Sequence, residues 1–396
     1  MDMDRRHFIA SAGAGLLLGS ARAETVEQPF GNGVRPLVAY PQKRKLIRLT
    51  TRPPQLETPM AAFDESLLTP NDAFFVRYHL ADIPTDRIDP LTYCVTVDGS
   101  VDHPLSLSLA DIKALGSQEI TAVCQCSGNG RGFFVPRVPG GQAANGLMGN
   151  ARWQGVSLRK VLDRAGVKRG AVEVAFDGLD EPVIPSTPDL VKSLPLDHAL
   201  DGDVMLAWAM NGEDLPFLNG YPLRVVVPGY FATYWVKHLS RITVRDTKLD
   251  NFWMAKAYRV PDTPCACVPP GTQPAATRPI GRMTARSFIT NIASGSTLHF
   301  APTHTARGIA FDGGSGIARV DVSWDGGKSW VPATLDADAG PYAFRGWIAP
   351  LRLTLGSHVL MARATSKAGE VQPLVADWNP GGYQRHVVEP VQVTVI

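Results

Sequence analysis

The stretch Val320–Trp330 reads VDVSWDGGKSW and decides the fold of the C-terminal part of the chain. Val320, Val322 and Trp324 alternate with polar residues, which is the period of a strand with one buried face. The DGGK sequence at 325–328 supplies a hairpin turn before the SWV run at 329–331. Further strands are predicted at residues 344–348, 358–364 and 387–395. These short strands predict an immunoglobulin-like β-sandwich over residues 282–396, typical of an interaction or dimerisation module.

Composition limits the possible classes of protein. The 396-residue chain has 39 Lys+Arg against 37 Asp+Glu, so its formal net charge is only +2. A nucleic-acid-binding protein usually has a clear basic excess, and that class is therefore disfavoured. Hydrophobic residues make up 44% of the chain, which supports packed cores and excludes wholesale disorder. Five cysteines in this length exclude a disulfide scaffold.

Residues 1–23 are predicted to be a twin-arginine signal peptide. The pattern Arg5-Arg6-His7-Phe8-Ile9 is followed by a short apolar stretch and by Ala21-Arg22-Ala23, which has the form of a signal-peptidase site. The apolar stretch is shorter than the ~20 residues of a membrane span. Twin-arginine export carries folded proteins, which matters when a cofactor is loaded in the cytoplasm. We therefore expect a soluble periplasmic protein without a membrane partner, with an amphipathic N-terminal helix as the alternative.

The remaining chain divides by composition. Residues 24–62 are proline-rich and are predicted to form an extended arm. Short strands and helices alternate over residues 63–260, with strands expected at 91–97, 119–126 and 223–227 and a helix at 157–165. Residues 261–281 contain the sequence PDTPCACVPP and are predicted to be a linker.

The most unusual local sequence is CQCSGNGR at 124–131. A predicted strand ends here in a glycine-rich turn, where Gly128 and Gly130 allow close approach of a ligand to the backbone. Cys126 at this junction is a candidate metal ligand, or equally a small packed residue, whereas Cys124 is predicted to be a buried apolar residue. Zinc would need four ligands, so the C-x-C spacing is weak evidence for it. The C-x-x-C-H motif that attaches c-type haem is absent from the chain.

Arg77 and His79 lie two residues apart in a predicted extended segment, FFVRYHL at 74–80. Residues i and i+2 of a strand project to the same side. An arginine and a histidine pointing together suit the capture of a small oxyanion, although a surface arginine beside a packed histidine is the commoner outcome.

Several of these segments together resemble the sulfite oxidase family of molybdopterin enzymes. The resemblance rests on the R-x-H segment, the CSGNGR turn, the run NGYPLRVVVPG at 219–229, the segments 151–153, 176–180 and 210–212, and VDVSWDGGKSW. These motifs occur in family order over nearly all of the chain beyond the signal peptide, and they are most similar to exported bacterial sulfite dehydrogenases. The resemblance implies an α+β chain: a mixed α/β molybdopterin-binding catalytic domain at 63–260, then the sandwich as a dimerisation domain.

The resemblance also implies roles for particular residues. Cys126 matches the protein thiolate ligand of molybdenum, a metal that a soft ligand suits. Arg77 and Arg131 match the arginines that hold the substrate oxyanion, and guanidinium groups suit this role because they donate in pairs. Tyr258 and His79 match an active-site tyrosine and a histidine beside the metal. The residues expected to contact the pterin cofactor are Phe75, Val76, Arg77, Tyr78, His79, Asp180, Asn219, Arg224, Trp235, Val236 and Lys237, with Arg224 and Lys237 at the pterin phosphate.

The implied activity is the oxidation of sulfite to sulfate by a homodimer that carries one molybdenum–molybdopterin per chain and no haem. Electrons would leave one at a time to a separate c-type cytochrome.

Two departures from the vertebrate pattern stand out: Asn219 replaces a histidine that contacts the pterin, and Gly313-Gly314-Ser315-Gly316 stands where a further substrate arginine is expected. One alternative is a periplasmic methionine sulfoxide reductase of the same superfamily, a class that generally lacks a C-terminal sandwich. The other is a non-catalytic periplasmic binding or adhesion protein.

Overall fold

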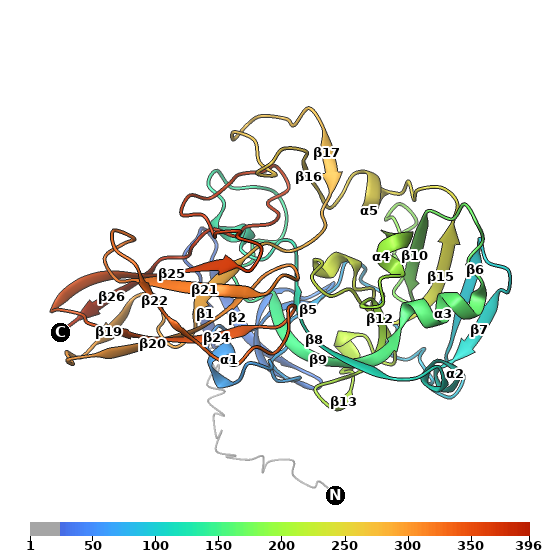
Figure 1. Ribbon diagram of the computed structural model, residues 1–396, viewed down its shortest axis with the longest axis horizontal. Coiled ribbons are helices and arrows are strands. Elements are labelled where there is room, and N and C mark those ends of the chain that lie inside the picture. Colours follow the sequence, from blue (N-terminus) through green and yellow to red (C-terminus); the bar gives the residue numbers. More distant parts are fainter. Residues whose placement is uncertain (1–23) are drawn as a thin grey trace, which may run out of the picture.

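The computed structural model describes residues 24–396, so the predicted signal peptide lies outside the described residues. Two modules lie side by side along the long axis of the molecule (Figure 1). We call residues 24–260 the N-terminal module and residues 282–396 the C-terminal module. No helix within the described range is long and apolar enough to cross a membrane.

Residues 24–62 form paired strands, and the prediction of an extended arm is wrong. β1 (Thr25–Glu27), β2 (Val34–Tyr40), β3 (Lys43–Thr50), β4 (Gln55–Glu57) and β5 (Val76–Arg77) make one antiparallel sheet in sequence order. Leu46 and Leu56 of this sheet are buried with Val76 and Tyr78 in a small core of their own. The proline-rich sequence without sustained periodicity gave no sign of these strands, and β5, which pairs with β4, lies about 20 residues further along the chain.

Two more sheets build the rest of the N-terminal module. One has the order β11 (Lys192–Pro195), β10 (Glu173–Gly178), β15 (Leu239–Arg245), β6 (Cys94–Gly99), β7 (Leu105–Ser108), with only β15 and β6 parallel. The other has the order β13 (Glu213–Asp214), β12 (Met205–Met210), β9 (Met148–Ser157), β8 (Gln118–Gln125), and β14 (Arg224–Val226) also pairs with β12. The predicted strands at 91–97, 119–126 and 223–227 correspond to β6, β8 and β14.

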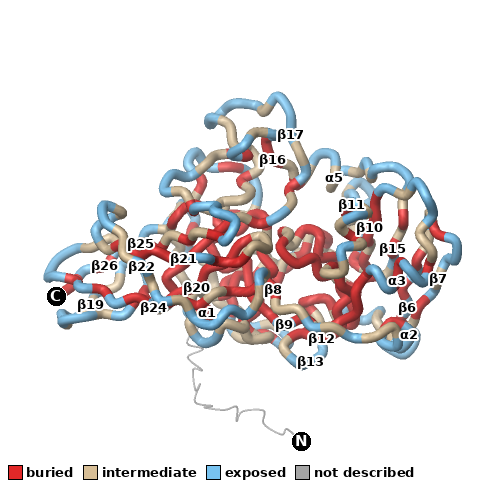
Figure 2. The backbone as a smooth tube through the Cα atoms, in the orientation of Figure 1, coloured by how far each residue is buried: buried red, intermediate tan, exposed pale blue. Residues whose placement is uncertain are grey.

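The helices of this module are short: α1 (Ala62–Glu65), α2 (Leu109–Ala114), α3 (Leu158–Ala165), α4 (Leu196–Ala199) and α5 (Phe252–Ala255). The predicted helix at 157–165 is α3, which buries Leu158, Val161 and Leu162 against the sheets. It ends at Gly166, whose left-handed conformation (φ 69°) suits glycine. Buried residues run continuously through the central strands, and the exposed loops lie around them (Figure 2).

The C-terminal module is a two-sheet sandwich, as its alternating sequence predicts. One sheet has the order β18 (Arg286–Ile289), β20 (His304–Phe311), β24 (Arg345–Leu351), β23 (Thr334–Leu335). The other has the order β19 (Ser296–Leu298), β26 (Val391–Val395), β25 (Gly356–Ser366), β21 (Ile317–Ser323), β22 (Val331–Pro332). The predicted hairpin joins β21 to β22, and the Asp325 carboxylate accepts the backbone N–H groups of Lys328 and Ser329, both at 3.0 Å. The predicted strand at 387–395 begins only at Val391.

The two modules share buried surface and are joined by more than a linker. Phe288, Phe311 and Phe344 of the C-terminal module belong to the same buried cluster as the core of the N-terminal module. The strand β16 (Arg259–Pro261), which ends at the first residue of the predicted linker, pairs with β17 (Thr277–Pro279) inside the linker. Residues 367–390, between β25 and β26, contain no strand and return to the N-terminal module.

Candidate active site

The Cys126 turn, residues 126–131, follows directly after β8. Cys126 N donates to Leu147 O (2.9 Å), and Asn129 N donates to Cys126 O (3.0 Å), which closes the turn. Gly130 has φ 84°, a conformation that favours glycine. A Cβ atom on Gly128 would lie 2.8 Å from the Arg131 guanidinium carbon. The two glycines therefore allow the chain to turn tightly enough to present the half-buried Cys126 thiol at a strand end.

One pocket beside this turn collects most of the predicted site residues. It encloses about 700 Å³ of space not filled by protein atoms, part of it open to solvent. The predicted residues that line it are Phe75, Arg77, His79, Cys126, Asp180, Asn219, Arg224, Trp235, Val236, Lys237 and Tyr258. Val76 and Tyr78 are not among the lining residues, because their side chains are buried on the other side of β5.

Sequence reasoning missed several lining residues: Phe74, Cys124, Ser127, Leu190, Leu218, Ala232 and Thr233. Ser127 lies within the recognised CSGNGR turn, and Thr233 lies two residues before the predicted Trp235, so their positions were the available signal. Cys124 is buried as predicted, and yet it also lines the pocket two residues before Cys126. Burial raises the pKa of the Cys124 thiol to about 11, which keeps it protonated at neutral pH.

The pocket carries more positive than negative groups. Lys237 Nζ donates to Arg77 O (2.6 Å) and lies 3.8 Å from the centre of the Tyr78 ring. Burial lowers the pKa of Lys237 to about 7, with Arg224 and Arg77 acting in the same direction and Asp180 opposing them. Burial raises the pKa of Asp180 to about 6, so this group, the only carboxylate among the lining residues, is still mostly ionised at pH 7 and faces two arginines and Lys237. An anionic ligand would complete this charge balance.

Tyr258 and His79 face each other in the pocket, and the Tyr258 hydroxyl contacts His79 Nε2. Burial lowers the pKa of His79 well below its usual value, and Arg77, Lys237, Lys192 and Arg131 lower it further, so His79 is neutral at pH 7. Burial raises the pKa of Tyr258, which therefore keeps its proton. Tyr258 has φ 54°, and such strain in a non-glycine residue is common at functional sites.

Arg131 is not among the lining residues and lies at the edge of the pocket. Its guanidinium group lies 4.9 Å from the centre of the Tyr383 ring, and its Nε donates to Gly382 O (3.3 Å). The Tyr383 ring in turn stacks on Tyr258, with ring centroids 5.4 Å apart. The C-terminal module thus reaches the site through Gly382 and Tyr383.

Gly313–Gly316 stand where the family resemblance predicts a further substrate arginine, and they are not among the lining residues of the pocket. In the structure they lie beside Arg282, Tyr342 and Lys367. The effect of the missing arginine on the substrate stays a prediction.

The donors and acceptors left open in the pocket fit molybdopterin, a polar anionic group. Within residues 24–396, Ser127 Oγ, Arg224 Nε and Thr233 Oγ1 are buried without a hydrogen-bond partner, and all three residues line the pocket. Unsatisfied buried polar atoms are costly unless a ligand completes them. The Arg224 guanidinium is held by Asn219 O (2.8 Å) and Trp235 O (3.1 Å), which fixes its orientation and leaves its Nε–H without a partner. The residues present therefore fit the cofactor.

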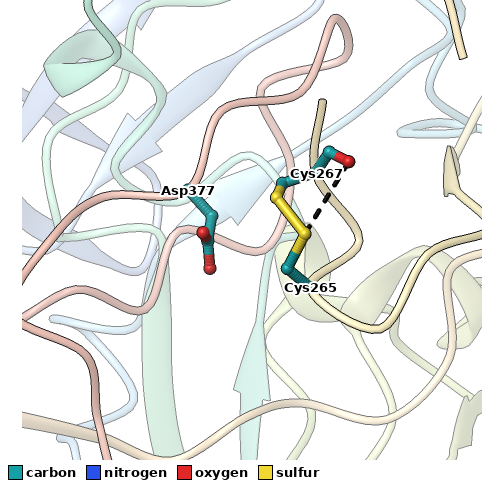
Figure 3. A group of neighbouring side chains, drawn as sticks. All are labelled: Cys265, Cys267 and Asp377. Carbon is teal, nitrogen blue, oxygen red and sulfur yellow. Dashed lines mark hydrogen bonds between the residues drawn. A yellow bond between two sulfur atoms is a disulfide. The ribbon is translucent and has the colours of Figure 1, made fainter. Parts of the chain in front are cut away.

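Cys265 and Cys267 form a disulfide near Asp377, outside this pocket (Figure 3). Because both sulfur atoms are bonded to each other, they offer no thiolate to a metal ion. The disulfide-bearing segment is tied to the 377–383 segment by the hydrogen bond from Val268 N to Trp378 O (2.9 Å).

Comparison with known proteins agrees with this site. Residues 80–253 match the oxidoreductase molybdopterin binding domain, and residues 277–395 match the Mo-co oxidoreductase dimerisation domain. The chain is 34% identical to sulfite oxidase from Gallus gallus over 367 residues, covering 88% of this chain and 78% of the relative. This chain belongs to the sulfite oxidase family. It is an oxidoreductase that binds molybdenum through molybdopterin, and the alternative of a non-catalytic binding or adhesion protein is wrong.

Other relatives extend the comparison. Sulfite oxidase from Arabidopsis thaliana is 30% identical, with 86% of this chain and 92% of the relative covered. The solved structure of the sulfane dehydrogenase SoxCD from Paracoccus pantotrophus matches with a TM-score of 0.75 and 28% identity, covering 87% of this chain and 86% of that one. The sulfite-oxidase-type fold followed by a β-rich dimerisation domain is thereby confirmed.

Proposed function

We propose that this enzyme oxidises sulfite to sulfate in the periplasm and passes the electrons singly to a separate c-type cytochrome. The observation that carries the proposal is a half-buried thiol, Cys126, in one pocket with Arg77, Lys237 and Arg224 and only one carboxylate. A cationic pocket suits a small oxyanion substrate. The names of the relatives, sulfite oxidases from animals and a plant, support sulfite as that oxyanion.

The side chains of the site contribute to substrate binding in different ways. Arg77 lines the pocket and offers paired donors to sulfite oxygens. Arg131, at the edge, adds positive charge that acts on His79 and Tyr258. Neutral His79 and protonated Tyr258 present a hydrogen-bonding pair without adding charge. These fixed positive charges and hydrogen-bonding groups stabilise the doubly charged sulfate product as well as the sulfite substrate.

Molybdenum held by the Cys126 thiolate and molybdopterin would supply the redox chemistry, as an acceptor of an electron pair and a source of oxygen for sulfite. The net reaction is SO₃²⁻ + H₂O → SO₄²⁻ + 2H⁺ + 2e⁻. The two electrons need an acceptor, and no C-x-x-C-H motif for haem attachment occurs in the sequence. A separate cytochrome is therefore proposed. The pattern in residues 5–23 supports export by the twin-arginine route, and the match to a dimerisation domain supports a homodimer.

Oxidation of a sulfane sulfur is the second candidate, because the SoxCD sulfane dehydrogenase matches over 87% of this chain. Both substrates would use the same cationic pocket. Methionine sulfoxide reduction is less favoured, because the chain carries a C-terminal dimerisation domain of the kind that such reductases generally lack.

Metal analysis combined with a substrate assay tests the proposal. The purified enzyme should contain one molybdenum per chain and reduce ferricyanide and a cytochrome c when sulfite is added. Cys126→Ser should lose turnover, whereas Cys94→Ser is the matched control because Cys94 is an exposed free thiol on β6. Molybdenum with activity toward a sulfane compound or a sulfoxide, and none toward sulfite, would overturn the proposed substrate.

A further inference from the structure

Arg286 belongs to the C-terminal module, but its side chain is buried against the N-terminal module. It is the first residue of β18 and is 1% exposed. Its Nη1 donates to Gln125 Oε1 (3.2 Å), and its Nη2 donates to Asn145 Oδ1 (3.0 Å). Gln125 directly precedes Cys126, and Asn145 lies in the loop of residues 143–147. One guanidinium group therefore joins the end of β8 to the loop that packs beside the Cys126 turn.

One acceptor of Arg286, Gln125 Oε1, leads directly into that turn. Gln125 Oε1 also accepts a hydrogen bond from Asn129 Nδ2 (3.1 Å), and Asn129 Oδ1 accepts from Leu147 N (2.9 Å). Leu147 O in turn accepts from Cys126 N (2.9 Å). The chain of bonds thus runs from Arg286 through two buried amide side chains to the backbone of the candidate metal ligand.

Two more residues of the C-terminal module enclose the same turn. Gln384 N donates to Ser127 O (3.0 Å). The alkyl part of Arg385 packs on Gly130, where an added Cβ would lie 2.9 Å from Arg385 Cδ. Glu389 receives two bonds from Arg385, both 3.1 Å, and a longer one of 3.4 Å from Arg286. The turn therefore lies between the two modules.

The free energy of folding alone does not explain a positively charged side chain at position 286. Burial lowers the pKa of Arg286 to about 10, which reports the cost of keeping this cation away from water. Glu389 is the only carboxylate that forms an ion pair with it among residues 24–396, at 3.4 Å. A hydrophobic side chain of similar size is often as stable as a buried ion pair. What an apolar residue cannot supply is a rigid pair of donors that fixes two acceptors at once.

We propose that Arg286 is a positioning residue for Cys126, and that the C-terminal module thereby sets the geometry of the metal-ligand turn in the neighbouring module. The inference rests on the role proposed above for Cys126. It assigns to the dimerisation domain a direct part in holding the active site.

Arg286→Met tests this inference, because methionine keeps most of the buried volume and removes the donors. Arg307→Met is the matched control: Arg307, on β20, also joins the modules through an ion pair, to Asp64 at 2.5 Å, but does not contact the turn. Hydrogen–deuterium exchange of peptides covering residues 124–132 and 143–147 is the direct readout. We expect exchange in these peptides to rise by about tenfold or more in Arg286→Met, because local opening becomes easier. In Arg307→Met it should stay at the wild-type rate.

Kinetics and a conservative variant complete the experiment. In Arg286→Met the kcat for sulfite should fall more than KM rises, because the ligand turn loosens while Arg77 stays in place. Arg286→Lys should give an intermediate exchange rate, since an ammonium group cannot hold both acceptors in a fixed fork. Wild-type exchange in Arg286→Met, or an equal rise throughout the N-terminal module, would overturn the proposal. If the wild-type enzyme does not oxidise sulfite, the exchange result still decides the positioning role separately from the substrate.

Discussion

Replacing Glu57 with glutamine should make the stability of the enzyme less dependent on pH. Glu57 ends β4, is 1% exposed, and accepts the backbone N–H groups of Ala144 (3.1 Å) and Gly146 (3.2 Å). Burial raises the pKa of its carboxyl group to about 7, although these two hydrogen bonds and Arg35 oppose the rise. Glu57 therefore holds the 143–147 loop while titrating near neutral pH.

The expected size follows from the displacement of this pKa from 4.5 to about 7. Because the folded-state value is the higher one, the folded protein binds the proton more tightly than the unfolded chain. This contribution to stability is complete below pH 4.5 and is lost as the pH rises to about 7. One pKa unit corresponds to about 1.4 kcal/mol, so the loss between pH 5 and pH 8 is about 2.5 kcal/mol.

Denaturant unfolding of the wild type and of Glu57→Gln at several values between pH 5 and pH 8 measures this change. Relative to the wild type, the variant should gain about 2.5 kcal/mol in free energy of unfolding over that range, whatever its offset at pH 5. Glu119→Gln controls for loss of a carboxyl group at a position whose side chain is 48% exposed. Parallel pH profiles for the wild type and Glu57→Gln would refute the reasoning, because the buried carboxyl would then not titrate in this range.

The pocket and the sandwich lead to three further predictions. Tyr258→Phe removes the hydroxyl that contacts the imidazole in the pocket, so kcat for sulfite should fall on the order of 10²-fold at constant molybdenum content; unchanged kcat would contradict its role. Arg77→Met should raise the sulfite KM roughly tenfold or more, because a charged hydrogen bond is worth about 1.5–3 kcal/mol; a wild-type KM would remove Arg77 from substrate binding. Gly308→Ala should lower the free energy of unfolding by about 2 kcal/mol or more, since its Cβ would lie 2.3 Å from the Trp347 ring. Denaturant unfolding measures this change, and Gly281→Ala, whose added Cβ would meet only an atom at 3.9 Å, should unfold like the wild type.

Local sequence signals predicted the sandwich well. The alternation in Val320–Ser323 matches β21, where Val320 and Val322 are buried, and Asp325 caps the predicted turn. Such signals work because strand period and turn chemistry depend on neighbouring residues. Residues 24–62 show the limit, because a proline-rich segment without sustained periodicity predicted an extended arm. In the structure this segment forms β1–β4, which pair with one another in sequence order, and β4 also pairs with β5.

The candidate site was predicted from motifs dispersed along the chain, and the structure brings eleven of the predicted residues into one pocket. The motifs could identify which residues carry donors, charges or a thiol. The motifs could not reveal that the Arg131 guanidinium lies over the Tyr383 ring. They also could not reveal that residues 382–385 of the C-terminal module pack on the site. No local pattern marks such contacts, because the partners are some 250 residues apart in sequence.

The sequence by itself determined the chemistry of this protein: a thiol at a strand end, arginines suited to an oxyanion, and a sandwich with a dimerisation pattern. Only the tertiary structure decided which residues hold these groups in position. Glu57 and Arg286 look like ordinary charged residues in the sequence, but both are buried. Glu57 binds the backbone of the 143–147 loop, and Arg286 binds the side chain of Gln125 beside Cys126. The physical reason is that burial raises the free energy of a charged side chain and determines which groups it can hold by hydrogen bonds. Burial is a property of the folded chain.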